Sequence, residues 1–174
     1  MFDKAADAPS EISTTAPAYD PGTQPEYFAG VLSRRLIAFL IDACIVVGPV
    51  LLLAMFIFVL GLVTFGLGWL LFWLLSPIFV IWALVYTGAT LGAPESATIG
   101  MRVMDLEMRI WTGAKMYFLL GAVHAIFFWV FTTVLTPLVL LIGLVNRRGR
   151  LLHDFFTGTM VINNERRAAS LRRG

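Results

Sequence analysis

Two long stretches of this chain contain no Asp, Glu, Lys or Arg, namely residues 43–94 and 116–146. Each exceeds the roughly 18 consecutive apolar residues that indicate a membrane-spanning helix, and the first is long enough for two. Only 14% of the chain is charged and 59% is hydrophobic, whereas a soluble domain has about 25% charged residues. These observations exclude a soluble globular domain, a coiled coil and a disordered chain. They predict an all-α integral membrane protein, a small helical bundle of three or four transmembrane or re-entrant helices.

The basic residues predict the orientation of these helices, because Lys and Arg in short loops stay on the cytoplasmic side. Three lie before the first apolar stretch, namely Lys4, Arg34 and Arg35, and three lie in the loop between the stretches, namely Arg102, Arg109 and Lys115. The others follow the second stretch and begin with Arg147. The turn at residues 61–68 has none. We therefore expect this turn outside, and the N-terminus and the central loop in the cytoplasm. The tail arginines lack interleaved aromatic residues, so nucleic acid is not an expected partner.

The chain divides into three parts by composition. Residues 1–27 are acidic and poor in large apolar residues, and predict a disordered tail. Residues 28–163 form the expected membrane domain, with spans at about 35–60, 69–87 and 116–145, and residues 164–174 form a basic C-terminal tail. The third span is too long for one straight crossing of the ~30 Å hydrocarbon core. It is either one kinked span or a hairpin broken near Thr136 and Pro137, and the hairpin would return the C-terminus to the cytoplasm.

Two short segments predict strands in this otherwise helical chain. Apolar and charged residues alternate over 104–110, which is the period of a half-buried strand. Residues 159–163 are rich in β-branched side chains and follow Gly158. Because a lone strand leaves its backbone groups without partners, we expect the two segments to pair at the cytoplasmic membrane surface.

Asp42 is the only ionisable residue inside the first predicted span. A charge at mid-helix costs about 2.5 to 3.5 kcal/mol on insertion scales, so Asp42 should face the bundle interior and find a partner. The candidates are Arg102, His124, the backbone of residues 88–92, and Arg147, Arg148 and Arg150. Arg35 shares a helical face with Asp42 but lies too far along the axis for a direct ion pair. Asp42 is then either a protonatable coupling site or a structural clasp.

The remaining polar residues give weaker signals. His124 falls within the third apolar segment, and His153 and Asp154 are adjacent in sequence, a spacing that does not direct two side chains to one point on a helix. The phosphate-binding, nucleophile and metal-ligand motifs of common enzymes are absent. We therefore expect no enzyme activity, no cofactor and no metal site.

Three segments resemble the RDD family of small bacterial membrane proteins: SRRLIAFLIDACI at 33–45, ESATIGMRVMDL at 95–106 and RLLHDFFTGTMVI at 150–162. By position, the family's arginine corresponds to Arg35 and its two aspartates to Asp42 and Asp154. The middle segment departs from the family, because Met101 stands where a lysine is usual and Asp105 where a glycine is common. The resemblance implies a multi-pass protein of the bacterial inner membrane, suspected of transport, with some relatives linked to sodium–proton exchange.

Two functions follow as hypotheses. The first is proton-coupled transport of an ion or small solute, with Asp42 titrating, Arg35 and Asp154 shaping the cytoplasmic mouth, and His124, His153, Arg102 and Arg150 in support. Because three or four helices rarely enclose a pathway, this function requires a homo-oligomer or another membrane protein. The alternative is a non-catalytic scaffold or assembly partner in which Arg35, Asp42 and Asp154 form one structural cluster.

Overall fold

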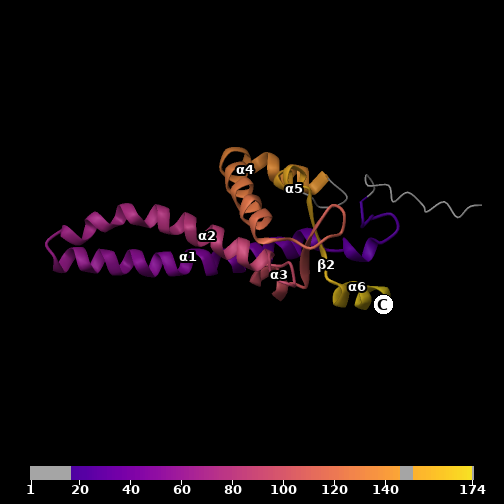
Figure 1. The fold of residues 1–174 in the computed structure, drawn as a ribbon, viewed down its shortest axis with the longest axis horizontal. Coiled ribbons are helices and arrows are strands. Elements are labelled where there is room, and N and C mark those ends of the chain that lie inside the picture. Colours follow the sequence, from indigo (N-terminus) through magenta and orange to yellow (C-terminus); the bar gives the residue numbers. More distant parts are fainter. Residues whose placement is uncertain (1–16, 146–150, 174) are drawn as a thin grey trace, which may run out of the picture.

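The computed structural model describes residues 17–145 and 151–173 (Figure 1). Its elements, in chain order, are η1 (Pro25–Tyr27), α1 (Val31–Val63), η2 (Leu67–Leu74), α2 (Leu75–Leu91), α3 (Ile99–Val103), β1 (Leu106–Ile110), α4 (Phe118–Val145), α5 (Leu152–Thr157), β2 (Thr159–Asn163) and α6 (Glu165–Arg173). The chain is therefore mostly helical, with one small sheet, as predicted.

The long arm at the left of Figure 1 is a hairpin of α1 against η2 and α2. By length and composition, α1 with the turn before it and η2 with α2 are each long and apolar enough to cross a membrane. Only 11% of the most apolar part of each is buried inside the protein, unlike the core helix of a soluble domain. The second of these segments differs from the prediction in beginning with eight residues of 3-10 helix.

Glycines allow the two limbs of this hairpin to meet at its tip. A Cβ on Gly68 would lie 2.6 Å from the backbone nitrogen of Gly61, and the indole of Trp69 occupies the space where a Gly61 side chain would be. Gly66 has a φ of 97°, a conformation that costs other residues strain. The predicted turn at residues 61–68 is thus confirmed, and Gly61 and Gly68 allow its two limbs to approach closely.

The third apolar segment is helical from Phe118 to Val145, through Thr136 and Pro137. This segment forms the single helix α4, so the helix is continuous at the two residues where a break was predicted. Figure 1 shows that α4 is not straight, and that its direction changes before the chain reaches α5. The helix α5 packs back against α4. This return brings the C-terminal segments to the same side of the molecule as β1.

The two predicted strands pair as expected. They are antiparallel, with Leu106 opposite Asn163 and Ile110 opposite Thr159. Every residue of β2 is buried, and in β1 the alternate residues Leu106 and Met108 are buried. Leu106, Met108 and Val161 join the core that also contains Val31 of α1. The sheet therefore closes one end of the helical arm.

The tails are more ordered than their composition predicts. Residues 1–16 of the expected tail lie outside the described residues. From Pro17 onward the chain packs: the amide of Ala18 donates to the carbonyl of Trp111 at 3.1 Å, and Tyr27 is buried against β2 and α6. The disorder predicted up to residue 27 does not apply to residues 17–27, because their few aromatic side chains find an apolar surface that the later strand supplies.

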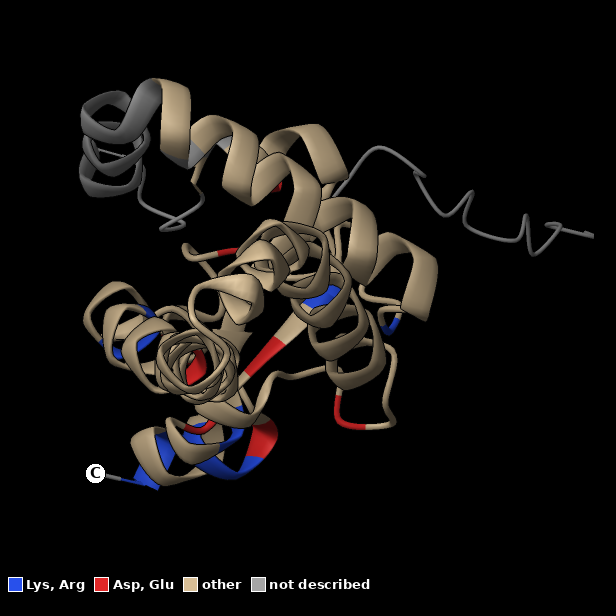
Figure 2. Ribbon diagram, turned by 90° about the vertical axis from the view of Figure 1, so that its left-hand side faces the viewer, with Lys and Arg blue, Asp and Glu red and all other residues tan. Residues whose placement is uncertain are grey.

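The basic C-terminal segment forms α6, whose residue Ala168 is fully buried. The hydroxyl of Tyr27 donates a hydrogen bond to Glu165 of α6, and this bond, with burial, raises the pKa of Tyr27 to about 12. Figure 2 shows Lys and Arg gathered mostly around α6, while the long helices are almost free of charge. The charged residues therefore form a cap at one end of an apolar arm.

Candidate functional site

Arg35 and Asp154 form a two-pronged ion pair between α1 and α5. The Nη1 of Arg35 lies 2.5 Å from Oδ2 of Asp154, and Nη2 lies 2.8 Å from Oδ1. Asp154 is fully buried and Arg35 is 9% exposed. Oδ2 also accepts the backbone amide of Leu151 at 2.9 Å, which caps the start of α5. A bidentate pair of this kind is the strongest geometry for an arginine and a carboxylate.

This pair keeps Asp154 ionised in a buried place. Burial alone would raise its pKa, but the charge of Arg35 and its hydrogen bonds outweigh that effect and hold the pKa of Asp154 well below its usual range. The carboxylate therefore stays negative at any physiological pH. The net charge of the pair is zero, which lowers the cost of burying it.

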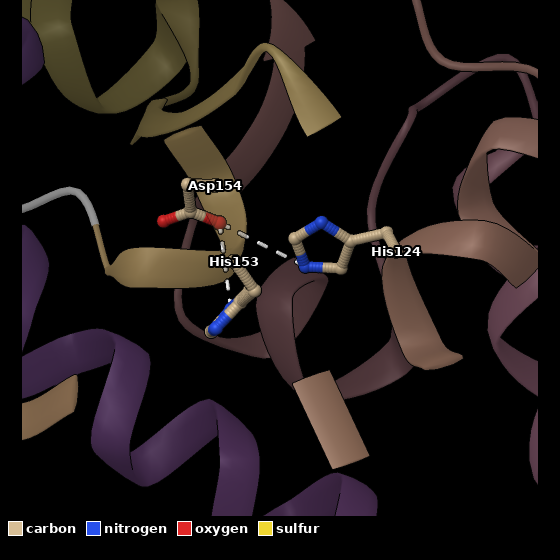
Figure 3. A group of neighbouring side chains, drawn as sticks. All are labelled: His124, His153 and Asp154. Atoms are coloured by element: carbon tan, nitrogen blue, oxygen red, sulfur yellow. Dashed lines mark ion pairs between the residues drawn. The ribbon is translucent and has the colours of Figure 1, made fainter. Parts of the chain in front are cut away.

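Two histidines lie beside the pair (Figure 3). The Nε2 of His153 is 3.5 Å from Oδ1 of Asp154, and the Nε2 of His124 is 3.8 Å from the same oxygen. Burial lowers the pKa of His153 to about 3, so its ring is neutral. Nη2 of Arg35 lies 3.2 Å from Nε2 of His153. Because a guanidinium can only donate, Nε2 accepts and the ring proton is on Nδ1.

His124 lies beside the hydroxyl groups of two threonines. Its Nδ1 is 3.1 Å from Oγ1 of Thr157 and 3.4 Å from Oγ1 of Thr159. The hydroxyl of Thr157 donates to the carbonyl of His153 at 2.9 Å. The Nε2 of His124 is the ring nitrogen that faces Asp154. This contact could not be predicted from the sequence, because His124 and Thr157 meet only where α5 packs back against α4.

His124, His153 and Asp154 bring one ligand atom each to within 4.8 Å of one another, the spacing of a potential metal site. Nη2 of Arg35, however, already donates to Oδ1 of Asp154 and to Nε2 of His153. Two of the three ligand atoms thus hold a guanidinium cation in the direction from which they would bind a metal. The group fits a metal ion only if Arg35 moves away.

Asp42 is bound by three neutral donors rather than by a cation. Its Oδ1 accepts the hydroxyl of Tyr86 at 2.6 Å and the amide of Gly100 at 2.8 Å, and its Oδ2 accepts the hydroxyl of Thr98 at 2.6 Å. Among the described residues no Lys or Arg forms an ion pair with it. Asp42 therefore ties α1 to α2 and to the start of α3 while keeping an uncompensated carboxyl group.

The partners predicted for Asp42 are wrong where the structure describes them. Arg102 pairs with Glu95 at 3.3 Å and donates to the carbonyl of Ala97, and His124 belongs to the Asp154 group. Arg147, Arg148 and Arg150 lie outside the described residues. Tyr86 and Thr98 were missed, although Thr98 precedes a helix and accepts the amide of Met101 as its N-cap. That pattern was the signal that could have identified Thr98.

Arg35, Asp42 and Asp154 do not converge into one cluster, but Arg35 and Asp42 line the same cavity. Its volume is about 150 Å³ and it lies between α1, α2, α4 and α5. His124 and His153 contribute to the wall beside Arg35, and Tyr86 and Thr98 to the wall beside Asp42. Most of the remaining wall is apolar, and the space exists because alanines stand at positions 38, 83 and 125.

Comparison with known proteins gives one match. The model of the RDD family matches residues 29–158, which include all three charged positions described above. No curated protein and no solved structure matches the chain.

Proposed function

The chain belongs to the RDD family, and on that premise we propose that it is a multi-pass protein of the bacterial inner membrane that transports an ion or small solute. The two apolar helices and the family membership support the membrane location. The positions of the basic residues favour the charged cap in the cytoplasm, with both ends of the chain on that side. The transported species would pass through the cavity between α1, α2 and α4.

The observation that supports this proposal is that Asp42 and Arg35 line the same cavity, with His124 and His153 beside Arg35. A purely structural carboxylate in an apolar helix would be sealed in protein, whereas Asp42 is half-buried and borders an open space. In the proposed mechanism Asp42 takes up and releases a proton as the solute enters and leaves. Arg35 and Asp154 stay paired and hold the cytoplasmic end of α1 in place.

The size of the chain makes an assembly part of the proposal. Two long helices and α4 line the cavity on three sides, so a second copy or another membrane protein would complete a pathway.

The test is proton exchange in everted membrane vesicles that contain the full chain. Addition of a candidate cation should change the internal pH with wild-type protein, and Asp42→Asn should abolish that change at normal protein abundance. Asp105→Asn is a matched control, since Asp105 lies in the cap and bonds Arg166 and Asn164, and it should leave exchange unchanged. Exchange that persists in Asp42→Asn contradicts coupling through Asp42.

A scaffold role is the second candidate, and a specific observation favours it. Every hydrogen bond of the Asp42 carboxylate and both prongs of the Arg35 pair join α1 to later elements of the same chain. Under this function the hydrogen bonds of Asp42 and the Arg35–Asp154 pair hold α1 in place against the rest of the chain, and the folded protein offers its surface to a partner. No exchange for any cation, together with loss of abundance in both Asp42→Leu and Arg35→Ala, would favour the scaffold.

A further inference from the structure

We propose that the cavity between α1, α2, α4 and α5 binds an organic ammonium ion, a positively charged nitrogen that carries an apolar body the size of one aromatic ring. The inference rests on the proposed function for the role of the cavity as a binding chamber, and it names the class of solute that would exchange for a proton at Asp42. Three observations lead to it: the carboxylate in the cavity wall, the aromatic rings beside that carboxylate, and the size and edge of the cavity.

The carboxylate in the wall belongs to Asp42. Asp42 and the two residues whose hydroxyl groups bind it, Tyr86 and Thr98, all line the cavity. A carboxylate has about four acceptor positions, and the two hydroxyl groups and the amide of Gly100 occupy three of them. Oδ2 accepts one of these bonds and can accept another. An ammonium ion beside this oxygen would supply the ion-pair partner that Asp42 lacks among the described residues.

The other charged residue of the wall does not cancel this negative charge. Among the described Asp, Glu, Lys and Arg residues, only Arg35 and Asp42 line the cavity. Seven residues separate them on α1, which is roughly 10 Å along the helix axis. Arg35 is neutralised by its bidentate pair with Asp154. The wall therefore carries a net negative charge when Asp42 is ionised, and this charge attracts a cation and repels an anion.

Aromatic rings lie next to this carboxylate. Tyr86 bonds it directly, and Phe39, which also lines the cavity, is three residues before Asp42 on the same face of α1. The rings of Phe39 and Phe128 have centroids 5.6 Å apart, and Phe128 meets Trp129 edge-on at 5.9 Å. The faces of aromatic rings attract ammonium groups, including those without an N–H donor. A wall of this kind favours an organic cation over a small metal ion, which prefers a shell of several oxygen ligands.

The size and the edge of the cavity determine the apolar body of the ligand. The volume of about 150 Å³ is that of a cavity that holds one benzene molecule. Phe39 and Trp129 line the cavity and are each 41% exposed, so the cavity reaches the surface of the protein between α1 and α4. Because α1 is long and apolar enough to cross a membrane, this edge faces lipid under the proposed function. A solute with an apolar body can enter there.

The experiment uses the full chain in micelles of a non-ionic detergent, with phenyltrimethylammonium as the probe, because the charge of this ion does not depend on pH. Equilibrium dialysis of the radiolabelled probe measures its binding. The matched neutral ligand is tert-butylbenzene, which has carbon in place of the charged nitrogen and is measured by competition at equal free concentration. We expect one saturable site per chain and at least ten-fold weaker binding of tert-butylbenzene. Equal binding of the two ligands would overturn the proposal.

Asp42→Asn tests the carboxylate, because it keeps the shape of the side chain and removes its charge. We expect the binding of phenyltrimethylammonium to weaken at least ten-fold and the binding of tert-butylbenzene to stay unchanged. Asp105→Asn in the charged cap is the control, since Asp105 bonds Arg166, and should bind both ligands as the wild type does. Unchanged binding of the cation in Asp42→Asn, or an equal loss of both ligands, would contradict the proposal.

Two variants of α4 locate the site. Ala125→Phe places a ring in the cavity and should abolish saturable binding, whereas Ile126→Phe puts the same side chain on the next, exposed residue and should leave binding unchanged. If Asp42→Asn does not fold, these two variants and the comparison of the two ligands decide. Unchanged binding in Ala125→Phe shows that the cation binds elsewhere, and the proposal fails.

Exchange in everted vesicles separates this inference from the proposed function. Saturable binding of phenyltrimethylammonium without exchange for any cation leaves the ligand site standing and removes transport. Exchange of another cation without saturable binding of phenyltrimethylammonium removes this ligand class and leaves transport standing.

Discussion

Asp154 and Asp42 are two buried or half-buried carboxylates that both hold α1, and they are stabilised in opposite ways. Asp154 is sealed and its charge is neutralised by Arg35. Asp42 faces a cavity and receives three hydrogen bonds from groups without charge. The first arrangement keeps the carboxylate ionised, and the second leaves Asp42 beside a cavity with no cation paired to it among the described residues. On α1, the two residues that make these contacts are seven positions apart: Arg35, which pairs with Asp154, and Asp42.

The largest effect is expected from breaking the charged pair. Asp154→Asn leaves the guanidinium of Arg35 buried without a counter-charge, and removal of one partner of such a pair costs about 3 to 5 kcal/mol. We expect strongly reduced abundance in the membrane and a lower unfolding temperature in detergent. The double variant Arg35→Leu with Asp154→Leu removes both charges and should be more stable than either single variant. A double variant as unstable as Asp154→Asn would show that the charge itself is not the source of the loss.

Gly100→Ala should disturb the Asp42 side alone. The new Cβ would lie 2.1 Å from the carbonyl oxygen of Ala38 and 2.9 Å from Cγ of Asp42, so α3 must move away from α1. Overpacking of this kind costs about 1 to 3 kcal/mol. Thermal unfolding measures the loss. Gly48→Ala on the same helix α1, where nothing lies within 4 Å of the new Cβ, is the matched control. Equal losses in both would mean that the close approach of α3 is not required.

The Asp154 group should also make stability depend on pH. Burial lowers the pKa of His153 to about 3, although Asp154 opposes that shift, while Arg35 and His124 add to it. A lowered pKa means that the unfolded chain binds the proton more readily, so this contribution is complete above pH 6.5 and is lost as the pH falls toward 3. We expect up to about 1.4 kcal/mol per pH unit from this proton, measured by denaturation between pH 7 and 5. His153→Gln should reduce the slope, and an unchanged slope assigns it to other groups.

Asp42→Asn should have the smallest effect on stability. The amide oxygen can still accept from Tyr86 and Gly100, and the amide nitrogen can donate to the hydroxyl oxygen of Thr98. We expect a loss of about 1 kcal/mol, because the hydrogen bonds weaken and the hydroxyl proton of Thr98 loses its acceptor. Abundance in membranes and thermal unfolding measure it. A loss as large as that of Asp154→Asn would remove the contrast between the two carboxylates.

Much of the fold could be predicted because its signals are local. The absence of charged residues from 43–94 predicted the apolar hairpin. The alternation of apolar and charged residues over 104–110, together with the β-branched residues at 159–163, predicted the strand pair. The limits of the disordered tail could not be read in the same way. Tyr27 is ordered by β2 and α6, which lie far along the chain and leave no trace in its own composition.

The site was predictable in its residues and not in its partners. Asp42 was identified by its isolation in an apolar segment, but the partners expected for it were arginines, His124 and the backbone of residues 88–92. Tyr86 and Thr98 are neutral and common in membrane helices and loops, so neither is conspicuous in sequence. The meeting of His124 with His153 depends on the path of α4, which periodicity does not determine.

The distance in sequence between Arg35 and Asp154, 119 residues, also has a consequence for the order of synthesis. At 5 to 20 residues per second, about 6 to 24 s separate the two residues on the ribosome. During that time α1 and α2 can enter the membrane while the guanidinium of Arg35 has no counter-charge. An unpaired arginine at a helix end stays at the water interface, so it would anchor α1 there until α5 and β2 arrive. The last fifth of the chain therefore supplies the counter-charge for α1, one of the first helices to be synthesised.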